Sequence, residues 1–274
     1  MHSHQRDCCK KAFEKTQLYQ TKSFEKKAHR NYQASQWTIW KYCAAKRQIP
    51  KRRQPDNQRR HKKKEFLGNL YRDGYTYTTK IIEVYDHDFP YLADGVVIPH
   101  TIYDLQRNRA YVNIGISKDT SEFACDSIKL WWLNCGRYQY PNSTSILMLA
   151  DSGGSNSCRH YIFKEDLQKL VDEIGVQIRV AHFPPYTSKW NPMEHRVFPH
   201  ITRSLKGVIL RSYEYVKELI ENTTTKTGLE VKAQIVDKVY QTGRKYSDNF
   251  KETMKIVLDD FLGQWNYKAI PENQ

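Results

Sequence analysis

An apolar run that ends in an acid, from Ile146 to Asp151, is the feature that most constrains the fold. Residues 146–150 are all apolar, and 152–156 are serine, glycine and asparagine. A short apolar run bounded by turn residues is typical of a strand buried on both faces, as in the centre of an α/β sheet. Ligands bind beyond the carboxyl ends of such strands, so Asp151 is placed for chemistry. The alternative is that Asp151 only caps the helix after the turn.

A second acid, Glu194, follows a comparable signal further along the chain. Residues 177–183 predict another strand, which the prolines at 184 and 185 end. In the sequence that follows, Asn191 suits a helix N-cap, Pro192 the first helical position, and Glu194 the third. The alternative is a capping box, in which Glu194 only bonds back to the amide of the cap residue.

The remaining pattern predicts an α/β domain with a mixed sheet. Antiparallel strands come first, and helices then alternate with strands, which is the element order of an RNase H-like fold. We expect Trp131 and Trp132 to belong to the core. The predicted elements are strands at 66–71, 75–84, 96–103 and 110–116, a helix after Thr120, a strand at 146–150, a helix at 161–174 ended by Gly175, a strand at 177–183, a helix from Pro192, and one helix between 246 and 266.

The excess of positive charge lies in the N-terminal quarter of the chain. Residues 1–64 contain 19 Lys+Arg and 4 Asp+Glu, whereas the rest contains 25 and 26. A basic segment is typical of a nucleic-acid-binding protein, and the alternative is a solvated disordered tail. The six cysteines form no CxxC pair, and the sequence has no membrane-length apolar run or signal-peptide core. We therefore expect a cytoplasmic protein without a membrane partner.

Five motifs carry a resemblance to a known family: LADSGGSN, HFPPYTSKWNPMEHRVFPHI, YDLQRNRAYVNIG, DTSEFACDSIKLWW and ENTTTKTGLEVKA. Together, over residues 62–267, they resemble the Rhodopirellula-type DDE transposases of bacterial insertion sequences, and the NPxE form is similar to the wider Tc/mariner-like group. The resemblance implies an RNase H-like fold, Mg²⁺ or Mn²⁺, and cutting and joining of DNA at transposon ends. It also implies that Asp151 and Glu194 are the second and third catalytic, metal-binding acids. A homodimer is a possible assembly. The residues from which we expect DNA contacts are Lys189, Trp190, Asn191, His195, Arg196 and Lys226.

The first acid of this family is absent from the chain. The family pattern resembles VDTKKKE, and Lys62 to Glu65 match its last four letters, so Arg60 occupies the position of the acid. The polar segment PDNQRRH is a poor central strand. We therefore expect the first strand to be missing or degenerate and the transposase to be inactive or impaired. The alternative function is a non-catalytic DNA-binding or regulatory remnant. Asp104 is a weak candidate to replace the acid, because it is predicted on a different strand.

A shift of the reading frame would explain this departure. If residues 56–61 are back-translated with ordinary codons and read one base later, they spell Ile-Ile-Ser-Val-Asp-Thr, which is an apolar strand with an acid. We therefore divide the chain into residues 1–61, which are basic and disordered or translated out of frame, and residues 62–274, a catalytic domain with a C-terminal extension. The N-terminal part would then be truncated or frameshifted relative to the family.

Overall fold

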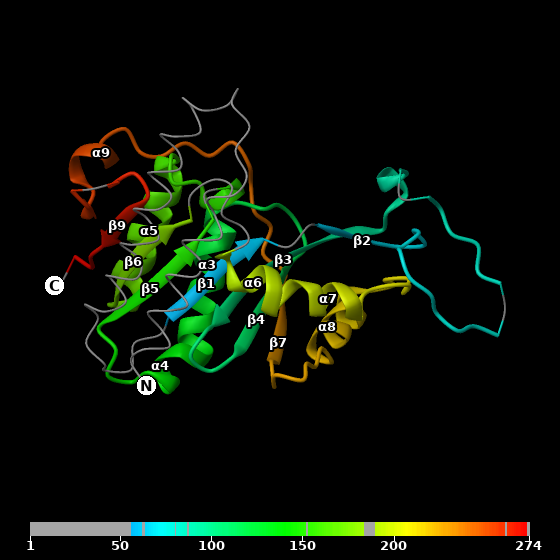
Figure 1. Ribbon diagram of the computed structural model, residues 1–274. Helices are drawn as coiled ribbons and strands as arrows, with labels where there is room; N and C mark the ends of the chain where they lie inside the picture. The colour runs from blue at the N-terminus through cyan, green and yellow to red at the C-terminus, as the bar shows by residue number, and fades with distance from the viewer. Residues whose placement is uncertain are drawn as a thin grey trace, which may run out of the picture.

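The structure is a computed structural model that describes residues 56–61, 64–79, 81–86, 88–151, 153–183, 190–260 and 262–272, with 56–61 and 156 described by their backbone alone. Nine strands among these residues form one mixed sheet, with helices on both faces (Figure 1). Eight of them follow the order β7-β4-β3-β1-β5-β6-β9-β8, and β2 pairs with β3 beside this path. The strands are β1 (Asp56–His61), β2 (Glu65–Leu67), β3 (Gly95–Asp104), β4 (Arg109–Gly115), β5 (Ser145–Ala150), β6 (Gln177–His182), β7 (Glu230–Val236), β8 (Ile256–Leu258) and β9 (Asn266–Ala269).

The central strand β1 corrects the expectation that the first strand is missing. Its backbone pairs antiparallel with β3 and parallel with β5, and this places Arg60 opposite Thr101 and Arg59 opposite Ala150. The prediction failed because it was based only on the polar side chains of this segment. Pairing on two sides satisfies the backbone groups of any sequence, and this tertiary context outweighs a weak strand propensity.

Strand directions agree with the predicted RNase H-like fold. β3 is antiparallel to both of its neighbours, β4 and β1, whereas β1, β5 and β6 are parallel. The side chains of Leu147, Leu149 and Val112 are at most 3% exposed, so the centre of the sheet is well covered. The predicted strands at 96–103, 110–116, 146–150 and 177–183 are confirmed within one residue at each end as β3, β4, β5 and β6.

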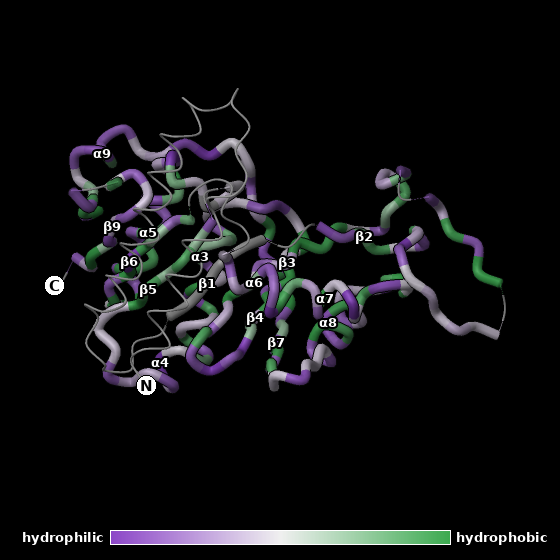
Figure 2. Tube along the Cα trace, viewed as in Figure 1, coloured by the Kyte–Doolittle hydropathy of each residue, from purple (hydrophilic) through white to green (hydrophobic). Residues whose placement is uncertain are grey.

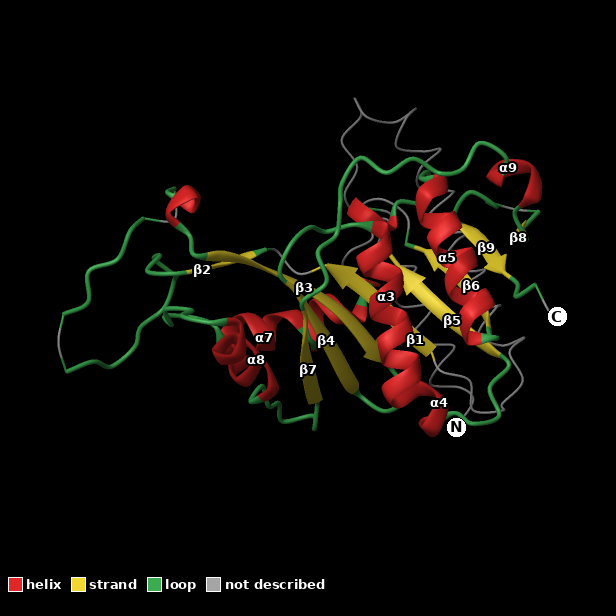
Figure 3. Ribbon diagram, turned by 180° about the vertical axis from the view of Figure 1, so that it is seen from behind, coloured by secondary structure: helices red, strands yellow, loops and turns green. Residues whose placement is uncertain are grey.

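Two groups of helices cover the two faces of the sheet (Figure 3). On one face, α3 and α5 bury Trp131, Trp132, Phe163 and other apolar side chains against strands that include β5 and β6. On the other face, α6, α7 and α8 bury a second set, including Met193, against β3, β4 and β7. The helices are η2 (Pro90–Leu92), α3 (Ser121–Trp131), η3 (Trp132–Gly136), α4 (Arg137–Gln139), η4 (Gly154–Asn156), α5 (Tyr161–Ile174), α6 (Pro192–Arg196), α7 (Phe198–Ser204), α8 (Tyr213–Glu221) and α9 (Phe250–Thr253).

Helix boundaries follow the predicted local signals. The hydroxyl of Thr120 accepts a hydrogen bond from the Phe123 amide at 3.2 Å and so caps α3. Helix α5 occupies the predicted range 161–174 and ends at Gly175, whose φ of 65° is readily adopted only by glycine. None of the helices in the described ranges is both long and apolar enough to cross a membrane.

The C-terminal part of the chain differs from the prediction of one helix between 246 and 266. Among the described residues of that range only the short helix α9 forms, and β8 and β9 follow it. β9 pairs antiparallel with β6, so the last described residues extend the sheet. Strand β7, which pairs with β4, was also missed. β7 and β9 pair with β4 and β6, which are far away in the sequence, and local periodicity cannot reveal such a partner.

Residues 68–94, which connect β2 to β3, extend away from the sheet, and we call them the arm (Figure 1). The predicted strand at 75–84 does not form within the described residues of the arm, whose only bridge joins Leu70 to Tyr85. Alternation of tyrosine with threonine suggested a strand, but a strand requires a partner. The hydropathy of the chain in Figure 2 shows apolar residues at the outer end of the arm.

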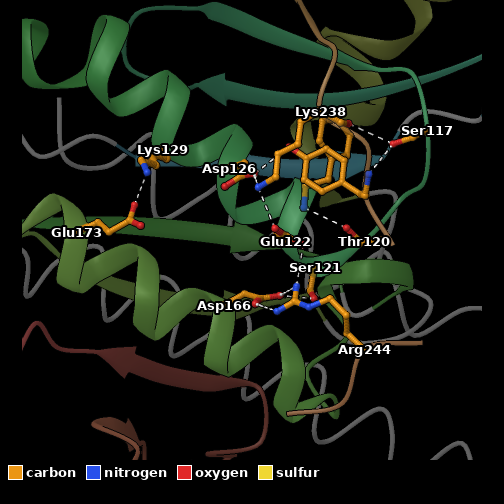
Figure 4. Close-up of polar contacts among 12 residues, drawn as sticks. Ser117, Thr120, Ser121, Glu122, Asp126, Lys129, Asp166, Glu173, Lys238 and Arg244 are labelled. Atoms are coloured by element: carbon orange, nitrogen blue, oxygen red, sulfur yellow. Dashed lines mark hydrogen bonds and ion pairs between the residues drawn. The ribbon is translucent and has the colours of Figure 1, made fainter. Parts of the chain in front are cut away.

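Residues 237–249, which follow β7, run past α3 and α5, and we call them the strap (Figure 4). Lys238 Nζ lies 2.8 Å from carboxylate oxygens of both Glu122 and Asp126 on α3. Arg244 bonds to Glu122 at 3.0 Å and to Asp166 on α5 at 2.8 Å. The strap therefore joins the two helices of one face through charged side chains.

Candidate active site

Asp151 lies where the sequence predicted, directly after the buried strand β5. The amide of Phe183 donates to the carbonyl of Ala150 at 2.7 Å, so β5 and β6 stay paired up to this point. The side chain of Asp151 is half-buried, and the turn with Gly153 and η4 follows it. The carboxyl end of a buried strand in an α/β sheet is where ligands commonly bind.

A buried histidine and tyrosine hold the backbone of Asp151. His182 Nδ1 lies 2.9 Å from the Asp151 carbonyl oxygen, and His182 Nε2 lies 3.0 Å from the Tyr267 hydroxyl. A carbonyl only accepts hydrogen bonds, so Nδ1 carries the proton and Nε2 accepts from the tyrosine. His182 and Tyr267 therefore position Asp151 from behind. Sequence reasoning missed both, because Tyr267 lies on the unpredicted strand β9.

Glu194 lies at the third position of α6, and the predicted cap is confirmed. The Asn191 side chain accepts from the Met193 amide at 3.1 Å, and Pro192 occupies the first turn. Met193 is fully buried in the core, which fixes the rotation of this short helix. Glu194 is half-buried at its surface. Asn191 is buried and its side chain is used as the cap, and the expected DNA contact of this residue stays a prediction.

Glu194 also lines an open groove with a volume of ≈440 Å³. The other lining residues come from α7 and the turn after it, and they are Phe198, Pro199, Thr202, Arg203 and Lys206. Arg203 and Lys206 place positive charge beside an acid that is expected to meet DNA. Sequence reasoning missed them, although residues 199, 202, 203 and 206 have the three- and four-residue spacing of one helix face.

The sheet register relates the two acids to β1. β1 and β5 are parallel with Arg59 opposite Ala150, so the next pair in this register is Arg60 and Asp151. Helix α6 lies against β1 on the face opposite α3 and α5 (Figure 1). Arg60 therefore lies on β1, which is the neighbour of the strand that leads to Asp151. The helix that carries Glu194 packs on the same strand. Within the described part of the chain, no group of three His, Cys, Asp or Glu side chains is arranged to hold a metal ion.

Asp104 is not placed to replace the missing acid. Its register partner on β1 is Asn57, three residues before Arg60, which is about 10 Å along a strand. Its carboxylate accepts from the Tyr140 hydroxyl at 2.8 Å and from the Gln106 amide at 3.0 Å. This buried carboxylate therefore closes the turn between β3 and β4, and its oxygens are used by the protein itself.

Substitution of Asp104 by asparagine is expected to change the pH dependence of stability. Burial raises the pKa of Asp104 above its ordinary value of 3.8, although the hydrogen bond from Tyr140 opposes the shift. At a pH between the ordinary pKa and the raised pKa, Asp104 keeps its proton in the folded chain and has released it in the unfolded chain. The free energy of unfolding therefore falls as the pH rises through this interval. Urea unfolding at a series of pH values should show that Asp104→Asn removes this decline.

The exposed residue Asp248 provides a matched control for this measurement. Asp248→Asn should leave the pH profile of unfolding unchanged. Asp104→Asn should also leave divalent-metal binding unchanged. A profile identical to that of the parent chain, or a loss of metal binding in Asp104→Asn, would contradict the structural role assigned to this residue.

The other residues predicted to contact DNA are spread over two parts of the structure. Trp190 is 43% exposed, and His195 and Arg196 are exposed on the helix that carries Glu194. Lys189 lies outside the described residues. Lys226 is exposed in the loop before β7, whose first residue pairs with Arg109 at the Asp104 end of the sheet. Lys226 therefore lies toward the end of the sheet away from Asp151.

The family is shown by a comparison with protein-family models. The model of the Rhodopirellula transposase DDE domain matches residues 11–271. The chain belongs to this family. The match begins well before residue 62, where the motifs of the resemblance begin, and it includes β1. The predicted division of the chain at residue 61 stays a prediction.

Solved structures of Mos1 transposase are also similar to the chain. A Mos1 transposase paired-end complex with left transposon end matches with a TM-score of 0.43 and 12% identity, covering 73% of this chain and 55% of that one. A Mos1 mariner paired-end complex with Mn gives 0.43 and 14%, with 73% and 54% covered. The chain thus spans about half the length of these proteins. A comparison with curated proteins finds no match.

Proposed function

We propose that the chain is the catalytic domain of an insertion-sequence transposase whose cutting and joining of DNA is impaired. Asp151 and Glu194 are its catalytic and metal-binding acids, Mg²⁺ or Mn²⁺ its cofactor, and transposon-end DNA in the cytoplasm its substrate. The observation that supports this proposal is the register of β1, in which Arg59 lies opposite Ala150, so Arg60 follows Arg59 where Asp151 follows Ala150.

The described residues fit a divalent metal site only in part. Carboxylate oxygens are the ligands that Mg²⁺ and Mn²⁺ prefer, and Asp151 and Glu194 supply them. A metal-dependent transfer of phosphoryl groups needs a cluster of such ligands, and no group of three occurs in the described ranges. Arg60 adds a positive charge at the position of the absent carboxylate, and this charge opposes cation binding. The present chain should therefore bind the metal weakly.

The groove beside Glu194 supports DNA as the substrate. Arg203 and Lys206 are exposed at its edge, and His195 and Arg196 are exposed on the preceding helix. Such side chains contact phosphates and position a duplex without reading its bases. Binding by this surface should be poorly specific and should weaken steeply as the salt concentration rises.

A single substitution tests the proposal. Arg60→Asp removes the positive charge and restores an acid, and it should raise Mn²⁺ affinity by at least ~10-fold, as measured by calorimetry. The gain should disappear in Arg60→Asp combined with Asp151→Asn, whereas Asp248→Asn should preserve it. Tight binding of two ions by the present chain would contradict the proposal.

Duplex oligonucleotides that carry the ends of the element test the activity itself. We expect cleavage in Mn²⁺ by the Arg60→Asp chain and none by the present chain or by Arg60→Asp with Glu194→Gln. Cleavage that does not depend on Glu194 would contradict the assigned site.

A second function, a non-catalytic DNA-binding or regulatory remnant, is favoured by one observation, the arginine at position 60. This function predicts that the present chain binds transposon ends without cutting them, and that it reduces cleavage by an intact family member. The frame hypothesis explains how one gene gives rise to an intact transposase in one reading frame and to the present chain in the other. The nucleotide sequence of the gene tests this hypothesis. Stop codons just upstream in the shifted frame, or no apolar strand in that frame, would exclude the hypothesis.

A further inference from the structure

Lys164, in the first turn of α5, is a buried lysine. Its side chain is 5% exposed, and no carboxylate in the described part of the chain forms an ion pair with it. The neighbouring acids bond to the strap instead. Glu165 accepts from the Ser247 hydroxyl at 3.0 Å, and Asp166 pairs with Arg244 at 2.8 Å. The ammonium group of Lys164 therefore has no ionic partner on its own helix.

This position of Lys164 costs free energy of folding. An ammonium group that leaves water without an opposite charge is destabilising, and burial accordingly lowers the pKa of Lys164 below its ordinary value of 10.5. The positive end of the helix macrodipole adds to this cost in the first turn. A methionine of similar length would fill the space without a buried charge. A role in function therefore explains the lysine better than stability does.

The first contact of Lys164 is with the turn that follows Asp151. Its Nζ atom donates to the carbonyl of Cys158 at 3.2 Å, and Cys158 is itself 2% exposed. Within the turn, the Ser157 amide donates to the Gly154 carbonyl at 3.3 Å. The bond from Lys164 ties this turn to α5, so it restricts the path of the backbone that leaves Asp151.

The second contact of Lys164 leads to the other support of Asp151. The ammonium group lies 5.3 Å from the ring centroid of Tyr267 and 4.9 Å from that of Tyr161. A cation is attracted to the face of such rings. The Tyr267 hydroxyl bonds to His182, whose other ring nitrogen donates to the Asp151 carbonyl. Lys164 thus helps to hold the tyrosine that orients this histidine.

We propose that Lys164 is a positioning residue that fixes both the carbonyl of Asp151 and the turn that follows it. Lys164 acts through Cys158 and Tyr267. The inference rests on the proposed function of Asp151 as a metal-binding acid, but its effect on the backbone does not require the metal. Groups that orient metal ligands typically change metal affinity by about 10–100-fold.

Amide hydrogen exchange of the full chain with Lys164→Met tests the effect on the backbone. The amides of Ser157 and His160 in the turn should exchange at least ~10-fold faster, because one hydrogen bond to the turn is lost. Amides within β5 should exchange as in the parent chain. The urea midpoint should stay the same or rise, because a buried charge is removed. An unfolded variant, a lower midpoint or faster exchange throughout the chain would show a purely structural lysine and overturn the proposal.

Calorimetry with Mn²⁺ tests the effect on the site in the Arg60→Asp chain. Lys164→Met should lower the Mn²⁺ affinity of this chain by roughly 10-fold. The matched control is Lys232→Met, which removes an exposed lysine from β7 and should change neither the affinity nor the exchange. An unchanged affinity in Lys164→Met would overturn the proposal. If Arg60→Asp itself gains no affinity, the proposed function fails, and hydrogen exchange still decides whether Lys164 fixes the turn.

Tyr267→Phe tests whether Lys164 acts through the tyrosine. This substitution keeps the ring beneath the ammonium group and removes the hydroxyl that bonds to His182. It should lower the Mn²⁺ affinity of the Arg60→Asp chain. Combined with Lys164→Met, it should lower the affinity by less than the product of the two separate effects, because both act partly through His182. Two effects that multiply fully would exclude the route through Tyr267.

Discussion

A chain in which β1 carries the six residues of the shifted reading frame is expected to resist urea better than the present chain. The substitutions are Asp56→Ile, Asn57→Ile, Gln58→Ser, Arg59→Val, Arg60→Asp and His61→Thr. β3 and β5 flank this strand, and nearly all of their residues are buried. Apolar side chains at positions 56, 57 and 59 would thus leave water on folding, and each contributes roughly 1.5–3 kcal/mol. We expect a net gain of about 3–6 kcal/mol in the free energy of unfolding.

A chain with five of these substitutions, in which Arg60 is retained, separates packing from charge. It should keep most of the gain in stability and none of the gain in Mn²⁺ affinity, because only position 60 continues the register with Asp151. Urea unfolding and calorimetry measure the two effects on the same samples. A six-residue variant that is less stable than the present chain would show that β1 does not occupy the centre of a buried sheet.

Loss of Arg244 is expected to destabilise the fold by roughly 2–4 kcal/mol, because it leaves a buried carboxylate without its ion pair. The Asp166 side chain is only 4% exposed, and Arg244 bonds to both of its oxygens, at 2.8 and 3.3 Å. In Arg244→Ala the remaining partner of Asp166 is the Ser121 hydroxyl, which donates to Asp166 at 2.6 Å. Arg244 itself is 32% exposed, so its own desolvation is modest.

A double-mutant cycle isolates this interaction. Arg244→Ala should cost less free energy when Asp166→Asn is already present, because the asparagine carries no charge that needs a partner. Lys217→Ala is the matched control, since Lys217 forms an exposed pair with Glu221 within helix α8 at 4.0 Å. That substitution should cost at most ~1 kcal/mol. Equal costs for Arg244→Ala in the two backgrounds would show that the strap is held by other contacts.

Local signals in the sequence were sufficient for the elements that surround the site. The spacing of Phe163, Leu167 and Val171 and the stop at Gly175 defined α5, and the Asn191 cap defined the start of α6. Each of these signals depends on residues within about one turn of each other, which is why the chain alone displays them. The strand end at Asp151 was found for the same reason, from one apolar run and one turn.

Long-range pairing accounts for what the sequence did not reveal. β1 is polar and lies centrally because β3 and β5 pair with it, whereas the alternating residues 75–79 have strand-like character and no partner strand among the described residues. His182 was recognised as part of a strand, but its role beside Asp151 needs Tyr267, which lies 85 residues away. Such relations become visible only when the sheet is assembled.

Two glycines cross where the arm leaves the body: a Cβ atom at Gly74 would lie 2.6 Å from the Gly207 nitrogen, and one at Gly207 would lie 2.7 Å from the Tyr75 nitrogen. The backbone contact determines where the arm points, and it involves none of the side chains at the outer end. Those side chains determine only the chemistry of the surface that the arm presents. A designer could therefore replace residues 75–84 to give the chain a new partner and keep the same approach geometry. A single alanine at position 207 would instead redirect an arm whose contact residues are unchanged.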